Sequence, residues 1–225
     1  MIHIIALLAR AGHGKTSVAN YLRDTYGAQI VPLAGPLKRC AQKVMHFSHE
    51  QLYGIQAEKE RVDPRYGFSA REFNQRLGTE GLQGEFGVDI HVRALLHDIA
   101  RLDAVLTDTD GIYVVDDARF PHEVNAIVNS EEHHGVCIKI VCTDAPPTPN
   151  GDHKSETSID DVYPEQIATT LVSSRVQGVP HLIGELEQAL TTNPRLAPIR
   201  RALLRRASSL AAHKAPTALE SEVTS

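Results

Sequence analysis

The feature that most constrains the fold is an apolar run followed at once by a glycine-containing turn and a helix. Residues 2–8 form this run, as expected for a strand buried on both faces of a parallel sheet. A helical stretch from about Lys15 to Tyr26 follows, and Gly27 can end it in the left-handed conformation. A strand, a turn and a helix in this order predict an α/β fold that binds ligands where its strands end.

The turn has the composition of a phosphate-binding loop. Residues 9–16 read ARAGHGKT, with alanine in place of the usual first glycine. Gly12 and Gly14 let backbone N–H groups point at phosphate oxygens, and the helix N-terminus favours anions. We expect Lys15 to reach the β- and γ-phosphates of ATP and the Thr16 hydroxyl to ligate Mg²⁺. The alternative is a glycine-rich turn with an incidental lysine. The candidate residues for ATP binding are Gly12, His13, Gly14, Lys15, Thr16 and Ser17.

Further strands are expected along the chain, with helical patterns between them. The predicted strands are 28–33, 112–115, 136–142 and 167–173. Helices predicted over 89–102 and 179–191 complete an α/β fold, a P-loop kinase-type parallel sheet of about five strands flanked by helices. We expect one domain over residues 1–192, with a mobile loop at 56–67, which is charged and broken by Pro64 and Gly67, and a lid-like loop at 143–164. Residues 193–225 are expected to form a basic helical and then disordered C-terminal tail.

The strand predicted at 112–115 ends in two carboxylates, Asp116 and Asp117. A buried strand that delivers an aspartate beside a phosphate-binding loop is typical of a magnesium site. Either carboxylate could serve, together with Thr16. The alternative is a structural role in which Asp117 caps the helix that begins near Pro121.

Composition excludes several classes of protein. The formal net charge of −5 does not fit a strongly basic nucleic-acid binder. Three cysteines, an odd number, argue against a disulfide framework and fit a reducing compartment. No segment approaches the roughly 20 apolar residues that span a bilayer, so we expect a cytoplasmic protein without membrane contact.

Four segments together carry a family resemblance. They are the loop at 9–17, Leu-Gly-Thr-Glu at 77–80, Asp-Ala-Arg-Phe-Pro-His-Glu at 117–123 and Asp-His-Lys-Ser-Glu at 152–156. In order and spacing, the chain resembles the deoxynucleoside monophosphate kinases, P-loop enzymes found widely in phages. The resemblance covers about residues 1–190. If a phage encodes the chain, the cytoplasm in question is that of its host.

This resemblance implies ATP-dependent phosphorylation of a deoxynucleoside monophosphate, which yields the diphosphate and ADP. It implies that residues 56–88 are an insertion forming the acceptor site. The site residues that it implies are Lys15, Asp117 and Arg119 for catalysis, Thr16 and Asp117 for the metal, and Thr79 and Glu80 for the acceptor. The acceptor phosphate is already a nucleophile, so the chemistry needs alignment and charge neutralisation and no strong general base.

Arg71 and Arg76 lie on one predicted helical stretch beside the acceptor segment. We expect them to hold the acceptor 5′-phosphate as a fork of two guanidinium groups. The alternative is that both are solvated surface arginines.

The predicted lid departs from the family pattern. Relatives often carry arginines after the fourth strand, whereas residues 142–146 contain none. The nearest basic candidates are Lys139, His153 and Lys154, and Lys154 is included among the expected substrate-binding residues.

The basic stretch 195–206 has two interpretations: a solvated cationic helix, or a contact surface for DNA or another partner. The second fits an alternative function, a P-loop kinase that phosphorylates a hydroxylated modified base in phage DNA. A further alternative is a nucleotide-binding switch protein without an acceptor. We expect small-molecule nucleotides as the main partners, and a homodimer is left open.

Overall fold

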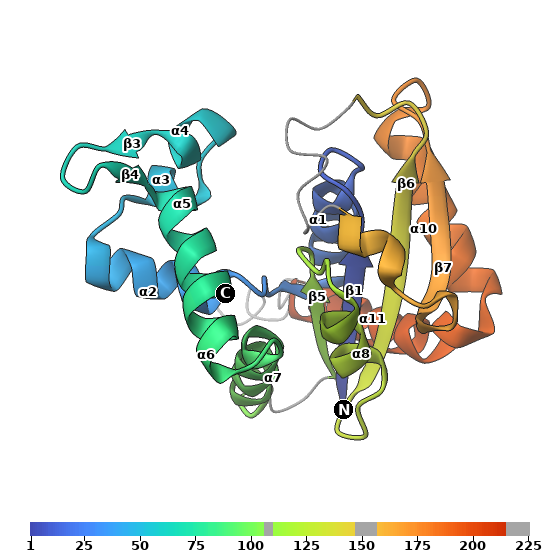
Figure 1. Cartoon of the computed structure of the whole chain (residues 1–225). Helices are drawn as coiled ribbons and strands as arrows, with labels where there is room; N and C mark the ends of the chain where they lie inside the picture. The colour runs from blue at the N-terminus through green and yellow to red at the C-terminus, as the bar shows by residue number, and fades with distance from the viewer. Residues whose placement is uncertain (106–109, 147–156, 215–225) are drawn as a thin grey trace, which may run out of the picture.

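The computed structural model describes residues 1–105, 110–146 and 157–214. Its centre is a parallel sheet of five strands in the order β2-β5-β1-β6-β7 (Figure 1). The strands are β1 (Ile2–Leu8), β2 (Gln29–Ile30), β5 (Gly111–Val115), β6 (His134–Cys142) and β7 (Ile167–Ser173). The predicted α/β fold with about five parallel strands is confirmed.

Helices cover both faces of this sheet. One face packs against α1 (Lys15–Tyr26), α10 (Gly178–Thr192) and α11 (Ala197–Lys214), and the other against α7 (Ile90–Asp103) and α8 (Pro121–Val128). The side chains of β1 alternate between the two cores, because successive residues of a strand point to opposite faces. Short 3-10 turns are η2 (Ser158–Asp161), η3 (Pro164–Gln166) and η4 (Pro194–Leu196). No helix in the described part of the chain is long and apolar enough to cross a membrane.

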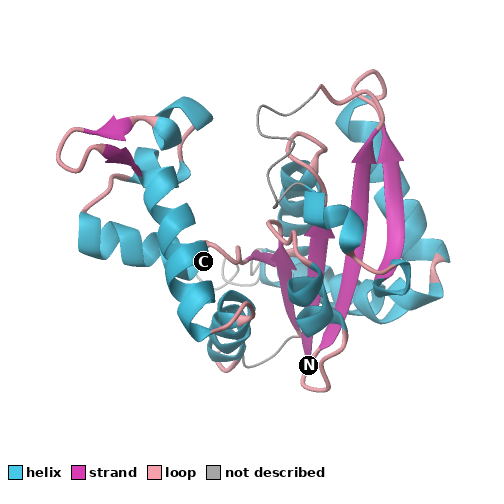
Figure 2. Ribbon diagram, viewed as in Figure 1, coloured by secondary structure: helices cyan, strands magenta, loops and turns pink. Residues whose placement is uncertain are grey.

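A second group of elements, the side lobe (residues 35–86), stands beside the β2 edge of the sheet (Figure 2). It comprises α2 (Gly35–Met45), α3 (His49–Tyr53), α4 (Gln56–Glu60), β3 (Val62–Asp63), β4 (Phe68–Ser69), α5 (Ala70–Gln75), the π-helix η1 (Arg76–Gln83) and α6 (Gly84–Phe86). The lobe has its own small core of Ala41, Phe47, Leu52 and Ala70. The ring of Phe47 meets those of Tyr66 and Phe73 edge-on, at 5.7 Å between ring centroids in each case.

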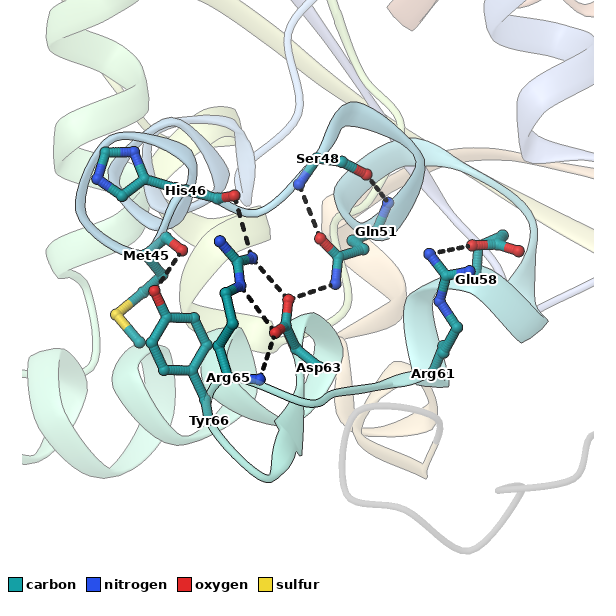
Figure 3. A network of polar contacts seen from close by, with 9 residues as sticks. All are labelled: Met45, His46, Ser48, Gln51, Glu58, Arg61, Asp63, Arg65 and Tyr66. Carbon is teal, nitrogen blue, oxygen red and sulfur yellow. Dashed lines mark hydrogen bonds and ion pairs between the residues drawn. The ribbon is translucent and has the colours of Figure 1, made fainter.

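Two regions expected to be loops are more structured than the sequence suggested. Residues 56–67, which are rich in charge, contain α4 and most of the β3–β4 hairpin. The buried carboxylate of Asp63 accepts hydrogen bonds from the Gln51 side chain at 2.9 Å and from the Arg65 guanidinium at 2.6 Å (Figure 3). The Arg65 guanidinium holds the pKa of Asp63 well below its usual range. The lid-like loop at 143–164 contains η2, and its residues 147–156 lie outside the described part.

The second strand is shorter than the predicted 28–33. Its ladder with β5 covers Gln29 and Ile30, and the N–H of Val31 still donates to the Val114 carbonyl at 2.9 Å. Pro32 has no N–H to continue the ladder, and the next two backbone N–H groups turn toward the side chain of Asp117.

The C-terminal helix is part of the domain, which corrects the boundary expected at 192. Leu196, Ile199, Ala202 and Leu203 are at most 1% exposed and belong to the same core as β1 and α1. The sequence prediction for residues 195–206 relied on their basic side chains, but the apolar residues at helical spacing determine where the helix packs. Residues 215–225, expected to be disordered, lie outside the described part.

Three of the five arginines of this stretch bond to other parts of the chain, whereas Arg200 and Arg201 are exposed. The guanidinium of Arg205 pairs with Asp110, with Nε at 2.9 Å. Arg206 donates to the carbonyl of Gly27, which ends α1, at 2.7 Å. Arg195 donates to two backbone carbonyls around η3 and β7, both at 2.7 Å. These three side chains hold α11 in place, which weakens the interpretation of the stretch as a nucleic-acid surface.

The packing of α11 predicts a contrast between neighbouring leucines. Leu203→Ala should lower the free energy of unfolding by about 2–5 kcal/mol, because Leu203 is 1% exposed. Leu204→Ala, at a side chain that is 47% exposed, should change it by less than about 0.5 kcal/mol. Urea unfolding followed by circular dichroism measures both values. Equal small losses would contradict the packing of this helix.

His3 predicts a stability that depends on pH. Its side chain is buried beside His134 on the neighbouring strand, and neither ring nitrogen has a hydrogen-bond partner among the described residues. Burial lowers the pKa of His3, a shift that Asp110 opposes and His134 reinforces. The native state therefore favours the neutral ring, and its stability should fall as the pH drops below about 6.5.

In the variant His3→Leu this loss should be smaller than in the unchanged protein by up to about 1.4 kcal/mol per pH unit. Urea unfolding at pH 7.5 and 5.5 provides the measurement. Comparing the two proteins cancels other groups, such as Glu123, that titrate in the same range. An identical pH dependence in both proteins would exclude His3 as the cause.

Candidate functional site

The phosphate-binding loop connects β1 to α1 in the conformation that its glycines permit. Gly12 and Gly14 have φ values of +79° and +97°, where residues with a Cβ are strained. A Cβ on Gly14 would lie 2.6 Å from Cδ2 of Leu182 in α10. Lys15 begins α1, so residues 12–17 occupy the turn and the first helical turn, where backbone N–H groups are available to an anion.

The Lys15 ammonium lies across this loop. It donates hydrogen bonds to the backbone carbonyls of Ala9 and, at 3.4 Å, of Arg10. Burial lowers the pKa of Lys15 to about 8; the charge of Arg119 adds to this effect, and Asp116 and Asp117 oppose it. A bound anion would stabilise the charged form, so the loop has an electrostatic preference for phosphate.

Contacts that sequence patterns did not indicate anchor the loop to the neighbouring strand. The ring Nδ1 of His13 accepts a hydrogen bond from the backbone N–H of Cys142, at the end of β6, at 3.2 Å. The Asp160 carboxylate on η2 pairs with Arg10 at 2.5 Å and with Lys139 at 3.3 Å. Lys139 is therefore engaged beside the loop. The other two basic residues considered for the lid, at 153 and 154, lie outside the described part.

Asp117 joins the sheet to the side lobe. Its Oδ1 accepts from the N–H of Leu33 at 2.7 Å, and its Oδ2 accepts from the N–H of Ala34 at 3.1 Å. These are the residues that lead into α2. The expected alternative, that Asp117 caps the helix beginning at Pro121, is wrong, because the residue at the start of that helix is Phe120 and both Asp117 oxygens bond to Leu33 and Ala34 instead. Asp116 lies near Lys15, and burial followed by the charge of Asp117 raises the pKa of Asp116.

Glu123 orders the turn that carries Arg119. One oxygen of its carboxylate accepts from the backbone N–H of Arg119 at 2.8 Å and of Phe120 at 3.0 Å, across the start of α8. The side chain is 6% exposed, and burial raises its pKa to about 7. The N–H groups that open a helix need such an acceptor, and this one fixes Arg119 and Phe120 in the wall of a cavity.

That cavity lies between the side lobe and the end of β5 and has a volume of about 360 Å³. Four cationic side chains line it: Lys38, Lys59, Arg71 and Arg119. Burial lowers the pKa of Lys38, and the nearby charge of Lys59 lowers it further. Burial is also the main cause that lowers the pKa of Arg119, to which the charge of Arg71 contributes. Converging cations in a partly buried cavity favour a ligand with concentrated negative charge.

The predicted acceptor residues divide into two groups. Arg71 and Thr79 line the cavity, whereas Arg76 and Glu80 are not among its lining residues. The Arg76 side chain is 63% exposed and pairs with Glu72 at 3.5 Å. Five residues along a helix separate two side chains by about 140°, so Arg71 and Arg76 cannot point the same way. The structure therefore does not bring the two arginines of the expected fork together, and the guanidinium near Arg71 is that of Arg119. The remaining candidate, Lys154, lies outside the described part.

The Leu-Gly-Thr-Glu segment lies within the π-helix η1, a form that is rare and often found at functional sites. Gly78 is buried, and a Cβ there would lie 3.0 Å from Leu37 of α2 and 3.4 Å from Nε2 of His91 of α7. His91 Nε2 also hydrogen-bonds to the Gly78 carbonyl at 3.1 Å. A glycine therefore lets η1 pack closely against two helices and close one side of the cavity.

Sequence reasoning missed several residues that line the cavity. They are Lys38, Gln51, Lys59, Asn74, Gln83 and His91. Only Asn74 had a usable signal, since it follows Arg71 by three residues and so shares its helix face. Lys38 and Lys59 come from helices whose relation to Arg119 depends on the tertiary structure.

No family model matches the chain. A protein of Acanthamoeba polyphaga mimivirus described as "Putative deoxynucleotide monophosphate kinase" is 32% identical over 164 residues, or 69% of this chain and 81% of the relative. The crystal structure of TT1252 from Thermus thermophilus is 14% identical, with a TM-score of 0.42, and the match covers 84% of this chain and 97% of that one. This likeness is too distant to bear on function. The mimivirus relative shows that the chain belongs to the deoxynucleotide monophosphate kinase family.

Proposed function

We propose that the protein transfers the γ-phosphoryl group of ATP to a deoxynucleoside monophosphate, giving a deoxynucleoside diphosphate and ADP. The observation that carries this proposal is a series of neighbouring charged side chains that runs from the loop to the cavity. The Lys15 ammonium interacts electrostatically with Arg119, Asp116 and Asp117, and Arg119 in turn interacts with Arg71. A donor phosphate at Lys15 and an acceptor phosphate at Arg71 would therefore share one site.

On the donor side, the loop residues fit a nucleoside triphosphate with Mg²⁺. The metal would need oxygen ligands, which the Thr16 hydroxyl and a carboxylate from the end of β5 can supply. Both oxygens of Asp117 already accept backbone hydrogen bonds, so we favour Asp116 as the metal-side carboxylate. When bound, Mg²⁺ would neutralise phosphate charge. Lys15 and the N–H groups of the loop would bind and orient the β- and γ-phosphates.

On the acceptor side, Arg71 and Arg119 would hold the 5′-phosphate, with Lys38 and Lys59 adding positive charge. The phosphate oxygen is the nucleophile, so the side chains need only align it and stabilise charge. Burial disfavours the charged forms of Lys38 and Arg119 in the free protein. The acceptor would remove this penalty by supplying the opposite charge.

The two alternatives receive less support. A kinase acting on a modified base in DNA needs a basic surface, yet Arg195, Arg205 and Arg206 are engaged within the chain. A switch protein that binds no acceptor would not need a second cavity lined by four cationic side chains.

A coupled assay of ADP release tests the proposal. With ATP and Mg²⁺, at least one deoxynucleoside monophosphate should stimulate ADP release, and Lys15→Ala should reduce the rate by about 10²–10³-fold. Stimulation only by duplex DNA containing hydroxymethylated pyrimidine would move the acceptor into the polymer. ATP hydrolysis unaffected by any monophosphate would instead support the switch protein.

The same assay separates the two arginines of the side lobe. Arg71→Ala should raise the KM for the monophosphate and lower kcat, with kcat/KM reduced about 10²-fold or more, because a charged hydrogen bond to phosphate is lost. Arg76→Ala is the matched control and should leave both constants within about twofold, since its exposed side chain pairs with Glu72. Equal losses in both variants would restore the arginine fork.

A further inference from the structure

A second cavity lies across α2 from the cavity described above, which is called the first cavity here. The second cavity has a volume of about 500 Å³, and its walls come from residues 30–32, α2 and α7. Pro36 and Arg39 of α2 line it, whereas Leu37 and Lys38 of the same helix line the first cavity. No residue lines both cavities, and the proposed phosphoryl transfer does not use the second one.

The walls of the second cavity are mostly apolar. Seven of its ten lining residues are apolar, namely Ile30, Val31, Pro32, Pro36, Leu95, Leu102 and Val105. Two of them remain open to solvent, since Leu102 is 39% exposed and Val105 is 74% exposed. The volume falls within the roughly 300–1,000 Å³ that is typical of small-molecule sites. A ligand with an apolar body would remove these side chains from water, which favours binding.

The other three lining residues are charged, and one of them has no partner. Arg39 Nη2 pairs with Asp98 Oδ2 at 2.5 Å, so these two charges compensate each other. Arg101 follows Asp98 by three residues on α7, and its guanidinium makes no hydrogen bond or ion pair with any residue that the structure describes. Its planar group of N–H donors is therefore available to an anionic group beside the apolar walls.

This charge pattern differs from that of the first cavity. Four cationic side chains line the first cavity, which suits the concentrated charge of phosphate groups. In the second cavity Asp98 offsets one of the two arginines, so the walls suit a single negative charge.

We propose that the second cavity binds a small amphipathic anion, with an aromatic or aliphatic body and one carboxylate, sulfonate or phosphate group. The apolar body would lie against residues 30–32 and Leu95, and the anionic group would bind the guanidinium of Arg101. The inference is independent of the proposed phosphoryl transfer, because it uses neither the phosphate-binding loop nor the first cavity.

Fluorescence titration with anilinonaphthalene sulfonate, an aromatic anion, tests this site in the full chain. The probe should bind saturably. Arg101→Glu should weaken its binding about tenfold or more, because a repulsion replaces an attraction. Arg200→Glu makes the same change of charge at an exposed position of α11 and is the matched control, which should leave the affinity within about twofold.

A second probe separates loss of charge from a damaged fold. N-phenylnaphthylamine has the same rings without the sulfonate, so Arg101→Glu should leave its affinity within about twofold. Leu102→Asp should weaken both probes at least about fivefold, because it makes a wall of the cavity polar. Leu204→Asp, at a leucine of α11 that is 47% exposed, is its control and should weaken neither probe.

Competition shows which cavity holds the sulfonate probe. Excess ATP with Mg²⁺ should leave it bound, and Lys15→Ala should keep its affinity, because the phosphate-binding loop is a separate site. The inference is overturned if the sulfonate probe does not bind, or if ATP displaces it completely. It is also overturned if Arg101→Glu and Arg200→Glu weaken it equally, or if Arg101→Glu weakens both probes equally.

Discussion

The carboxylate of Asp117 is the contact on which the rest of the site depends. It accepts hydrogen bonds from the backbone N–H groups of Leu33 and Ala34, and so connects the end of β5 to the chain that enters the side lobe. Backbone N–H groups at a turn need acceptors, and a charged acceptor makes a strong bond. This contact brings Lys38 on α2 and Arg119 after β5 to one cavity.

Burial sets the electrostatic character of this site. It lowers the pKa of Lys15 and Lys38 and raises that of Asp116 and Glu123, so charge of either sign is disfavoured in the free protein. The cations outnumber the carboxylates that remain available, because Asp117 and Glu123 accept backbone hydrogen bonds. Bound phosphate groups would supply the missing negative charge. The protein side chains that receive them are already held in place. Such preorganised charge is the main means by which phosphoryl transfer is accelerated.

Sequence reasoning succeeded where the determinants are local. The loop at residues 9–17 lies in a continuous strand-turn-helix pattern, so its place at the end of β1 could be predicted. It failed where tertiary contacts decide. Asp63 orders residues 56–67 through Arg65 of the same stretch and through Gln51 of α3, and the apolar residues of α11 pack that helix into the core despite its basic residues. Lys38 and Lys59 were missed because no sequence spacing links either of them to Arg119.

The central claim is that the loop and the cavity form one continuous site for two nucleotides. Binding of a compound that joins adenosine to a deoxynucleoside through a polyphosphate chain tests it most directly, with ATP and the monophosphate measured separately. A single site predicts that the joined compound binds about 100-fold or more tightly than either nucleotide, and that Lys15→Ala and Arg71→Ala each weaken it. Affinity no greater than that of ATP alone, unaffected by Arg71→Ala, would contradict the claim.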